Sequence, residues 1–168
     1  PAIRFCKDRI SKLSKHYPGK RIVLPAGSLK VRSNDTDYRF RAHSAFSYFT
    51  GVTGSDAVPD SVFILEPSGD GHEPLLFIHP RSSRDTDEFY RDAKYGEFWV
   101  GRRMTEDETT LKYGMAVRQI EDLKEFLLGQ VPTLVLRSES LVVDSSVVED
   151  KDGEAELLTY LSEIRLIK

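Results

Sequence analysis

Apolar positions near the start of the chain recur at helical spacing. Ile3, Ile10 and Leu13 are separated by residues rich in Lys and Arg, and this pattern predicts an amphipathic helix over residues 3–16. The Tyr-Pro-Gly sequence at 17–19 ends the helix, because proline cannot continue it and glycine permits the turn.

Continuous apolar runs then predict short, buried strands. Residues 21–25 form the first run, and residues 61–65 and 75–78 form two more. A segment rich in Pro, Gly and Asp, residues 66–74, separates the latter two and predicts that they form a hairpin. Residues 133–136 predict a further strand.

Helical spacing returns in the second half of the chain. We expect a short helix over residues 85–92 and another that begins with a capping box at 105–108. Residues 120–127 have a clear amphipathic period, with Gly129 as the cap, and apolar spacing continues from 154 to 168.

Strands that alternate with helices predict an α/β domain with a mixed sheet, and residues 1–168 are expected to form one domain. Residues 28–60 show no clean period, as in functional loops or interface segments, and residues 149–153 predict a solvated turn. The last helical pattern runs to Lys168 without a cap, from which we expect a domain border there.

Composition narrows the possible functions. The hydrophobic fraction of 39% and the charged fraction of 30% fit a globular protein, and the net charge of -3 argues against a nucleic-acid partner. Cys6 is the only cysteine, so an internal disulfide is impossible and a reducing, cytoplasmic location is expected. No apolar run approaches the roughly 20 residues of a membrane span.

Catalytic and metal-binding motifs are missing from the sequence. The four histidines show no HExxH-type spacing, and there is no GxSxG elbow for a nucleophilic serine. The glycines at 51–54 lack the lysine and spacing of a phosphate loop and predict a turn. A Ser–His–Asp set assembles in space and stays an open alternative, but no residue pattern favours it, and we expect no catalytic residue and no bound cofactor or metal in this chain.

Two segments carry unusual chemistry. Residues 32–51 combine carboxylates, guanidinium groups and aromatic rings, as in a polar network that fixes a loop. Residues 97–103 contain the only tryptophan, Trp99, beside Arg102 and Arg103. A tryptophan flanked by arginines suits an interface anchor, and an ordinary core tryptophan is an equal alternative.

These segments resemble two motifs of the amino-terminal domain of aminopeptidase P, an Xaa-Pro aminopeptidase. The first motif is Asp35-x-x-Tyr38-x-Phe40-Arg41-x-x-Ser44-x-Phe46-x-Tyr48-Phe49-Thr50-Gly51. The second is Trp99-Val100-Gly101-Arg102-Arg103. The ending, residues 162–168, resembles the start of the helix that links this domain to the catalytic domain. The order and spacing agree across most of the chain.

The resemblance implies a non-catalytic α/β domain with a mixed, six-stranded sheet, of the ribonuclease H-like creatinase/prolidase type. Its expected partner is a carboxyl-terminal "pita-bread" domain that holds two divalent ions, typically manganese, and removes the residue preceding proline from short peptides. The amino-terminal domain is expected to support a homo-oligomer, a dimer or tetramer, and to shape the active-site entrance. A prolidase domain and a stand-alone peptide- or protein-binding module are alternatives.

The same resemblance assigns roles to individual residues. Asp35 matches an aspartate in a charge network near the active site, and Arg41 matches the arginine of the family's FRxxS stretch, with a structural or network-forming role. Trp99 matches a tryptophan that in tetrameric members reaches the active-site mouth of a neighbouring subunit. We therefore expect Trp99 at the substrate entrance and, with Arg102 and Arg103, at the oligomer interface. The chain departs from the pattern where Ala42 replaces the usual glutamine and where residues 137–156 are short and acidic.

Overall fold

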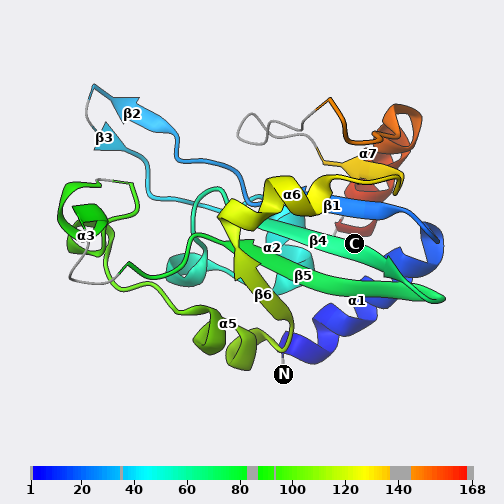
Figure 1. The fold of residues 1–168 in the computed structure, drawn as a ribbon, viewed down its shortest axis with the longest axis horizontal. Helices are drawn as coiled ribbons and strands as arrows, with labels where there is room; N and C mark the ends of the chain where they lie inside the picture. The colour runs from blue at the N-terminus through cyan, green and yellow to red at the C-terminus, as the bar shows by residue number, and fades with distance from the viewer. Residues whose placement is uncertain (1, 35, 83–86, 93, 137–144, 166–168) are drawn as a thin grey trace.

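The computed structural model describes residues 2–34, 36–82, 87–92, 94–136 and 145–165. A five-stranded mixed sheet lies at its centre, in the order β6-β5-β4-β1-β7 (Figure 1). β4 is antiparallel to β1 and β5, while β7 is parallel to β1 and β6 is parallel to β5. The strands are β1 (Arg21–Pro25), β4 (Val62–Ser68), β5 (Gly71–Ile78), β6 (Ala116–Gln119) and β7 (Thr133–Val135).

The predicted α/β class with a mixed sheet is confirmed, but the sheet of the described residues has five strands rather than six. Four of these strands coincide with the apolar runs in the sequence. β6 was not predicted, because its side chains are mostly exposed at the sheet edge and give no apolar alternation. Pairing with β5 defines this strand.

The hairpin of β4 and β5 is longer than predicted. Residues 66–74 were expected as a connection, yet the ladder continues from Leu65 opposite Pro74 to Ser68 opposite Gly71. Pro67 is tolerated because β1 pairs with β4 only as far as Leu65, so no donor is needed there. The turn itself is confined to the tip of the hairpin.

Helices cover both faces of the sheet. The first face carries α1 (Ala2–His16), α2 (Ser44–Thr50) and α7 (Lys151–Arg165), whose apolar residues form one core with the sheet. On the opposite face, α6 (Leu123–Leu127) follows the 3₁₀ turn η2 (Ile120–Asp122) and packs on a smaller core. None of the described helices is long and apolar enough to cross a bilayer.

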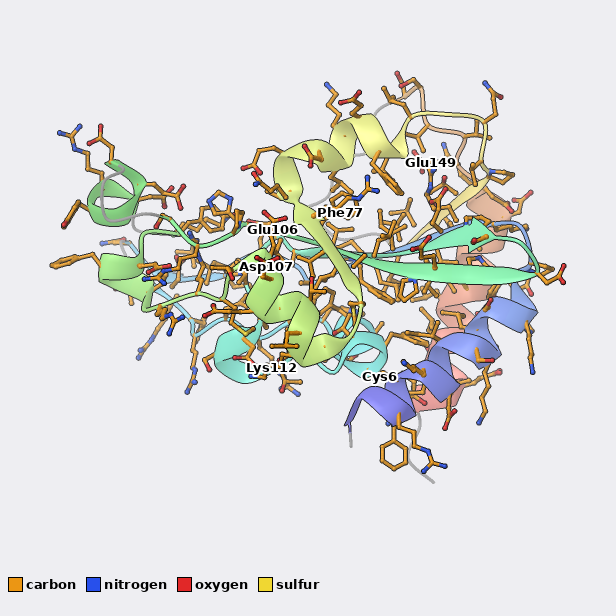
Figure 2. The ribbon with its side chains drawn as sticks, turned by 60° about the horizontal axis from the view of Figure 1, so that its bottom comes forward. Cys6, Phe77, Glu106, Asp107, Lys112 and Glu149 are labelled. Carbon is orange, nitrogen blue, oxygen red and sulfur yellow. The ribbon has the colours of Figure 1, made fainter. Side chains whose placement is uncertain are left out.

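Alternation along the strands produces these two cores. Ile22 and Leu24 of β1 point to the first face, whereas Val23 between them points to the second. Phe77 of β5 lies under α6, where its ring is 5.2 Å from that of Phe126 (Figure 2). Cys6 of α1 is buried against the core (Figure 2).

The irregular segment 28–60 contains more structure than its sequence indicated. It holds a small hairpin of β2 (Val31–Ser33) and β3 (Thr36–Asp37), then α2 and the 3₁₀ turn η1 (Gly54–Asp56). The α2 helix begins after His43, which caps it, and ends at Gly51 in the left-handed conformation. Its buried aromatic residues decide its position through packing.

Elsewhere, the observed helix boundaries differ from the predicted ones by a few residues. The last helix, α7, begins at Lys151 rather than after a solvated turn, because Asp150 accepts a hydrogen bond from Gly153 N at 2.9 Å. The capping box is confirmed at Thr105 and Glu108, at the start of α5 (Glu106–Tyr113). The predicted helix at 85–92 is α3 (Asp87–Arg91), and residue 85 lies outside the described residues.

The segment around Trp99 forms the single turn of helix α4 (Glu97–Val100). α3 and α4 contact each other and make a small lobe, residues 87–92 and 94–100. This α3–α4 lobe projects at the same end of the molecule as the β2–β3 hairpin (Figure 1). The two segments that carry the sequence motifs therefore converge in space.

Candidate functional site

A groove of about 620 Å³ lies between the hairpin side and the α3–α4 lobe. Residues 36–40 line one side, and Val100, Arg102 and Arg103 line another, so both motifs contribute to it. Among the described residues that line it, four are cationic and one, Asp37, is acidic. We call this feature the basic groove and define its charged residues as Asp37, Arg39, Lys94, Arg102 and Arg103.

Asp60 lies next to the groove and contacts Lys94, one of the residues that line it. Its carboxylate accepts hydrogen bonds from Ser28 and Tyr95 and forms an ion pair with Lys94 at 2.5 Å. Its φ of 62° lies in the left-handed region, which aspartate tolerates better than most side chains. This strained position is fixed by a backbone bond from Asp60 N to Gly27 O at 2.8 Å.

The environment of Asp60 changes the titration of the groups around it. Burial raises the pKa of Asp60, but the hydrogen bonds from Lys94, Ser28 and Tyr95 outweigh burial and lower it overall. Burial and the adjacent carboxylate raise the pKa of Tyr95 to about 12, so its hydroxyl stays a donor. Asp60 and Lys94 therefore remain charged at neutral pH.

Arg103 is the most deeply buried cation of the groove, with 7% of its surface exposed. Its Nη2 donates to Glu88 Oε1 at 2.7 Å, and its backbone N–H donates to Glu97 at 3.4 Å. Glu88 also accepts from His79 Nε2 at 3.1 Å, and Glu97 also accepts from Arg81 at 3.3 Å. The carboxylates of the α3–α4 lobe thus hold Arg103 in place.

Arg103 retains unused donors. Its Nε and Nη1 are buried and have no hydrogen-bond partner in the described part of the chain. Buried donors of this kind are rare in native structures and are costly to leave unpaired. Arg102, by contrast, is exposed and bonded to Glu108 of the capping box.

The remaining predicted residues fall in different places. Arg41 is exposed, does not line the groove, and makes no ion pair among the described residues. Trp99 belongs to α4, beside the groove residue Val100. Asp35 lies outside the described residues. The structure thus brings Arg102 and Arg103 together with residues 36–40, and Arg41 is not part of that group.

Sequence reasoning missed the residues that organise the groove. Asp60, Lys94 and Glu88 come from separate parts of the chain, and each looks like an ordinary surface charge in the sequence. Glu97 begins the segment 97–103, but its contacts with Arg81 and Arg103 could not be predicted. The Pro-Asp pair at 59–60 was the one available signal for an unusual turn. No group of three or more His, Cys, Asp or Glu side chains suited to a metal gathers within the described ranges.

The fold and the groove define the class of this protein. It is an α/β domain with a mixed sheet and a basic surface groove beside a small helical lobe. Residues 6–134 match the family described as "Aminopeptidase P, N-terminal domain". The chain belongs to this family.

Related sequences agree with this assignment. The chain is 39% identical over 163 residues to Xaa-Pro aminopeptidase 1 of Streptomyces coelicolor, covering 95% of this chain and 32% of that protein. It is 37% identical to Xaa-Pro aminopeptidase 2 of the same organism, covering 95% of this chain and 34% of that protein. The chain therefore spans about a third of the length of these curated relatives.

Solved structures share the fold at lower identity. Proline aminopeptidase P II from Yersinia pestis superposes with a TM-score of 0.69 at 19% identity, over 99% of this chain and 39% of that one. Escherichia coli aminopeptidase P with the inhibitor Pro-Leu superposes with a TM-score of 0.66 at 24% identity, over 98% of this chain and 34% of that one. At such identities the likeness concerns the fold.

Proposed function

We propose that this chain is the amino-terminal domain of an Xaa-Pro aminopeptidase, a hydrolase that removes an amino-terminal residue preceding proline. Membership of the aminopeptidase P family and the high coverage by Xaa-Pro aminopeptidases support this. Short proline-containing peptides are then the substrates of the parent protein. Its catalytic domain is the main partner of this one.

Catalysis is assigned to the rest of the parent protein. Two divalent ions, with manganese as the expected metal, would clamp the attacking and leaving atoms of the hydrolysis there. The described residues of this chain offer no cluster of ligands that fits such a pair. We expect the isolated chain not to hydrolyse Xaa-Pro peptides.

The role of this domain is to support the oligomer and to shape the active-site entrance. The observation that carries this is the α3–α4 lobe, where Tyr90, Phe98 and Val100 are all at least half exposed next to the basic groove. The rings of Tyr90 and Phe98 are 6.2 Å apart, so they form one apolar surface. Exposed aromatic residues beside arginines are typical anchors of protein interfaces.

The test uses the full-length parent protein with single substitutions in the lobe, Phe98→Ser and Trp99→Ala. We expect a smaller assembly by light scattering, or a KM for an Xaa-Pro peptide raised at least about tenfold, as for an interface anchor. Metal content should not change, because neither substitution touches the metal-binding domain.

Phe5→Ser is the matched control, because Phe5 is 61% exposed on α1, which packs against α2 and β5. This variant should keep the native mass and KM. An unchanged mass and an unchanged KM in both lobe variants would refute the role of the lobe in assembly and at the entrance.

A further inference from the structure

The cations of the basic groove differ in whether they are already neutralised. Lys94 is paired with Asp60, and Arg102 with Glu108. Arg39 is exposed and makes no ion pair within the described residues. Arg103 has charged partners, yet its Nε and Nη1 donate to nothing in the described part of the chain. The lining of the groove therefore includes one cation without an ion pair, Arg39, and one arginine whose two unpaired donors are buried, Arg103.

The unused donors of Arg103 are suited to a planar anion. A guanidinium presents its N–H groups in a rigid fork that matches the two oxygens of a carboxylate. The guanidinium of Arg103 is already held by Glu88 through Nη2, so less side-chain entropy is lost when a ligand binds. Its free nitrogens are shielded from bulk water, and an anion must displace the groups that shield them.

The groove also favours a single carboxylate over a more highly charged anion. Asp37 lines the same surface and would repel a phosphate dianion more strongly than a carboxylate. Much of the remaining lining is apolar, including Phe40, Pro59 and Val100. Its volume of about 620 Å³ falls within the range of sites that hold small ligands.

We propose that the basic groove binds the carboxyl terminus of a short peptide, with Arg103 and Arg39 contacting the terminal carboxylate. The apolar lining takes the side chain of the last residue. The carboxylate supplies the acceptors that Arg103 lacks, and Arg39 adds an unpaired positive charge. This inference concerns the groove of this chain alone and holds whether or not the α3–α4 lobe contacts another subunit.

The experiment titrates the 168-residue chain with three blocked peptides and follows it by ¹H–¹⁵N NMR. The probes are N-acetyl-Ala-Pro-Leu with a free carboxyl terminus, its carboxyl-terminal amide, and N-acetyl-Ala-Pro-Asp amide. We expect the free acid to bind at least about tenfold more tightly than the amide of the same peptide, the effect of a hydrogen-bonded charge pair. The Nε–H signal of Arg103 should move downfield with the free acid only.

Two substitutions locate the contact. Arg39→Gln removes an exposed charge and should keep the fold, while lowering affinity for the free acid about threefold or more. Arg103→Lys keeps the charge but loses the fork, and should abolish the preference for the acid over the amide. Arg91→Gln is the matched control, because Arg91 is an exposed arginine of α3 outside the groove.

Several outcomes would overturn the proposal. Equal affinity for the free acid and its amide would mean that no carboxylate is recognised. Preference for the aspartate-containing amide would assign the groove to an acidic side chain of a protein partner instead of a peptide terminus. Absence of binding by any probe would mean that water in the smaller cavity of about 70 Å³, which Arg103 also lines, satisfies its donors.

Discussion

At the scale of single residues, the properties of the charged side chains at the groove depend more on their partners than on their residue type. Asp60 and Arg103 would both be costly to bury alone, and each is held by hydrogen bonds from distant parts of the chain. The two side chains differ in how many of their polar atoms have hydrogen-bond partners. The carboxylate of Asp60 has partners on both oxygens, whereas the guanidinium of Arg103 keeps two nitrogens unpaired.

Asp60→Asn tests the value of the carboxylate without disturbing the backbone, since asparagine also tolerates a positive φ. At pH 7 we expect the variant to be less stable by about 1–2 kcal/mol, because the charged hydrogen bonds are weakened. The pKa of Asp60 is lowered in the folded protein, so its contribution is full above the unfolded pKa of about 3.9. That contribution should disappear as the pH falls through the lower, folded pKa.

The measurement is urea unfolding of both proteins between pH 7 and pH 3. The stability difference should narrow in the acidic part of this range. Asp70→Asn serves as control, because Asp70 is exposed at the tip of the β4–β5 hairpin. A difference that stays constant down to pH 3 would show that Asp60 is stabilised by something other than its charge.

At the scale of elements, packing overrides helix and strand preference in several places. The short helix α2 forms from a stretch rich in aromatic residues because Phe46 and Phe49 are fully buried against the sheet. β6 forms from an exposed sequence because β5 offers a free edge. α7 begins at Lys151 because Asp150 caps it and Leu134 of β7 lies against it.

Gly153, near the start of α7, provides a test of whether packing overrides helix preference. Helix preference alone predicts that Gly153→Ala stabilises the protein by about 1 kcal/mol. A Cβ at this position, however, would lie 2.6 Å from Leu134 Cδ2 and 2.7 Å from Asp150 Oδ2. Leu134 is completely buried, so we expect a loss of about 1–3 kcal/mol in thermal unfolding.

Thr159→Ala, at an exposed position later in the same helix, is the control for helix preference. It should change stability by less than about 0.5 kcal/mol. If Gly153→Ala raised the melting temperature, the contact between α7 and β7 would be looser than the structure indicates.

At the scale of the whole molecule, Arg21 connects β1 with β4 and α6, which lie far from it in the sequence. It lies in β1 with 4% of its side chain exposed, and pairs with Glu66 of β4 through Nε and Nη2 at 2.5 and 2.9 Å. Its Nη1 donates to Leu127 O of α6 at 2.9 Å. One side chain thus joins the sheet to the helix that covers its second face.

Arg21 is buried, so removing Glu66 alone leaves an unpaired charge inside the protein. This should lower the free energy of unfolding more than replacing both Arg21 and Glu66 with apolar residues. We expect Glu66→Leu alone to destabilise the chain by about 3 kcal/mol, and the double change R21M/E66L to cost less than Glu66→Leu. Denaturant unfolding with all three forms gives the comparison. Asp87→Ala, which breaks the exposed pair with Arg91, should cost under about 0.5 kcal/mol.

A double variant less stable than Glu66→Leu would indicate that the hydrogen bond to Leu127 O carries most of the stability. That result would contradict a leading role for the ion pair. It would leave the connection to α6 as the main contribution of Arg21.

Local patterns in the sequence determined much of this protein. The apolar runs of β1, β4, β5 and β7, the helical period of α1 and the capping box of α5 depend on near neighbours, so they could be predicted. The resemblance to aminopeptidase P followed from two local motifs, and the match of residues 6–134 confirms it. Which residues contact one another across the fold is a separate question, because such contacts join segments with no shared pattern.

Tertiary structure alone decided the sheet order, the exposed edge strand β6 and the basic groove. Arg102 and Arg103 were predicted as a pair, but the fold buries Arg103 among carboxylates and leaves Arg102 in solvent. Asp60 and Lys94 acquire their roles only when β4 and the lobe come together. The physical reason is that burial and charge pairing depend on distance in space, which the order of residues does not specify.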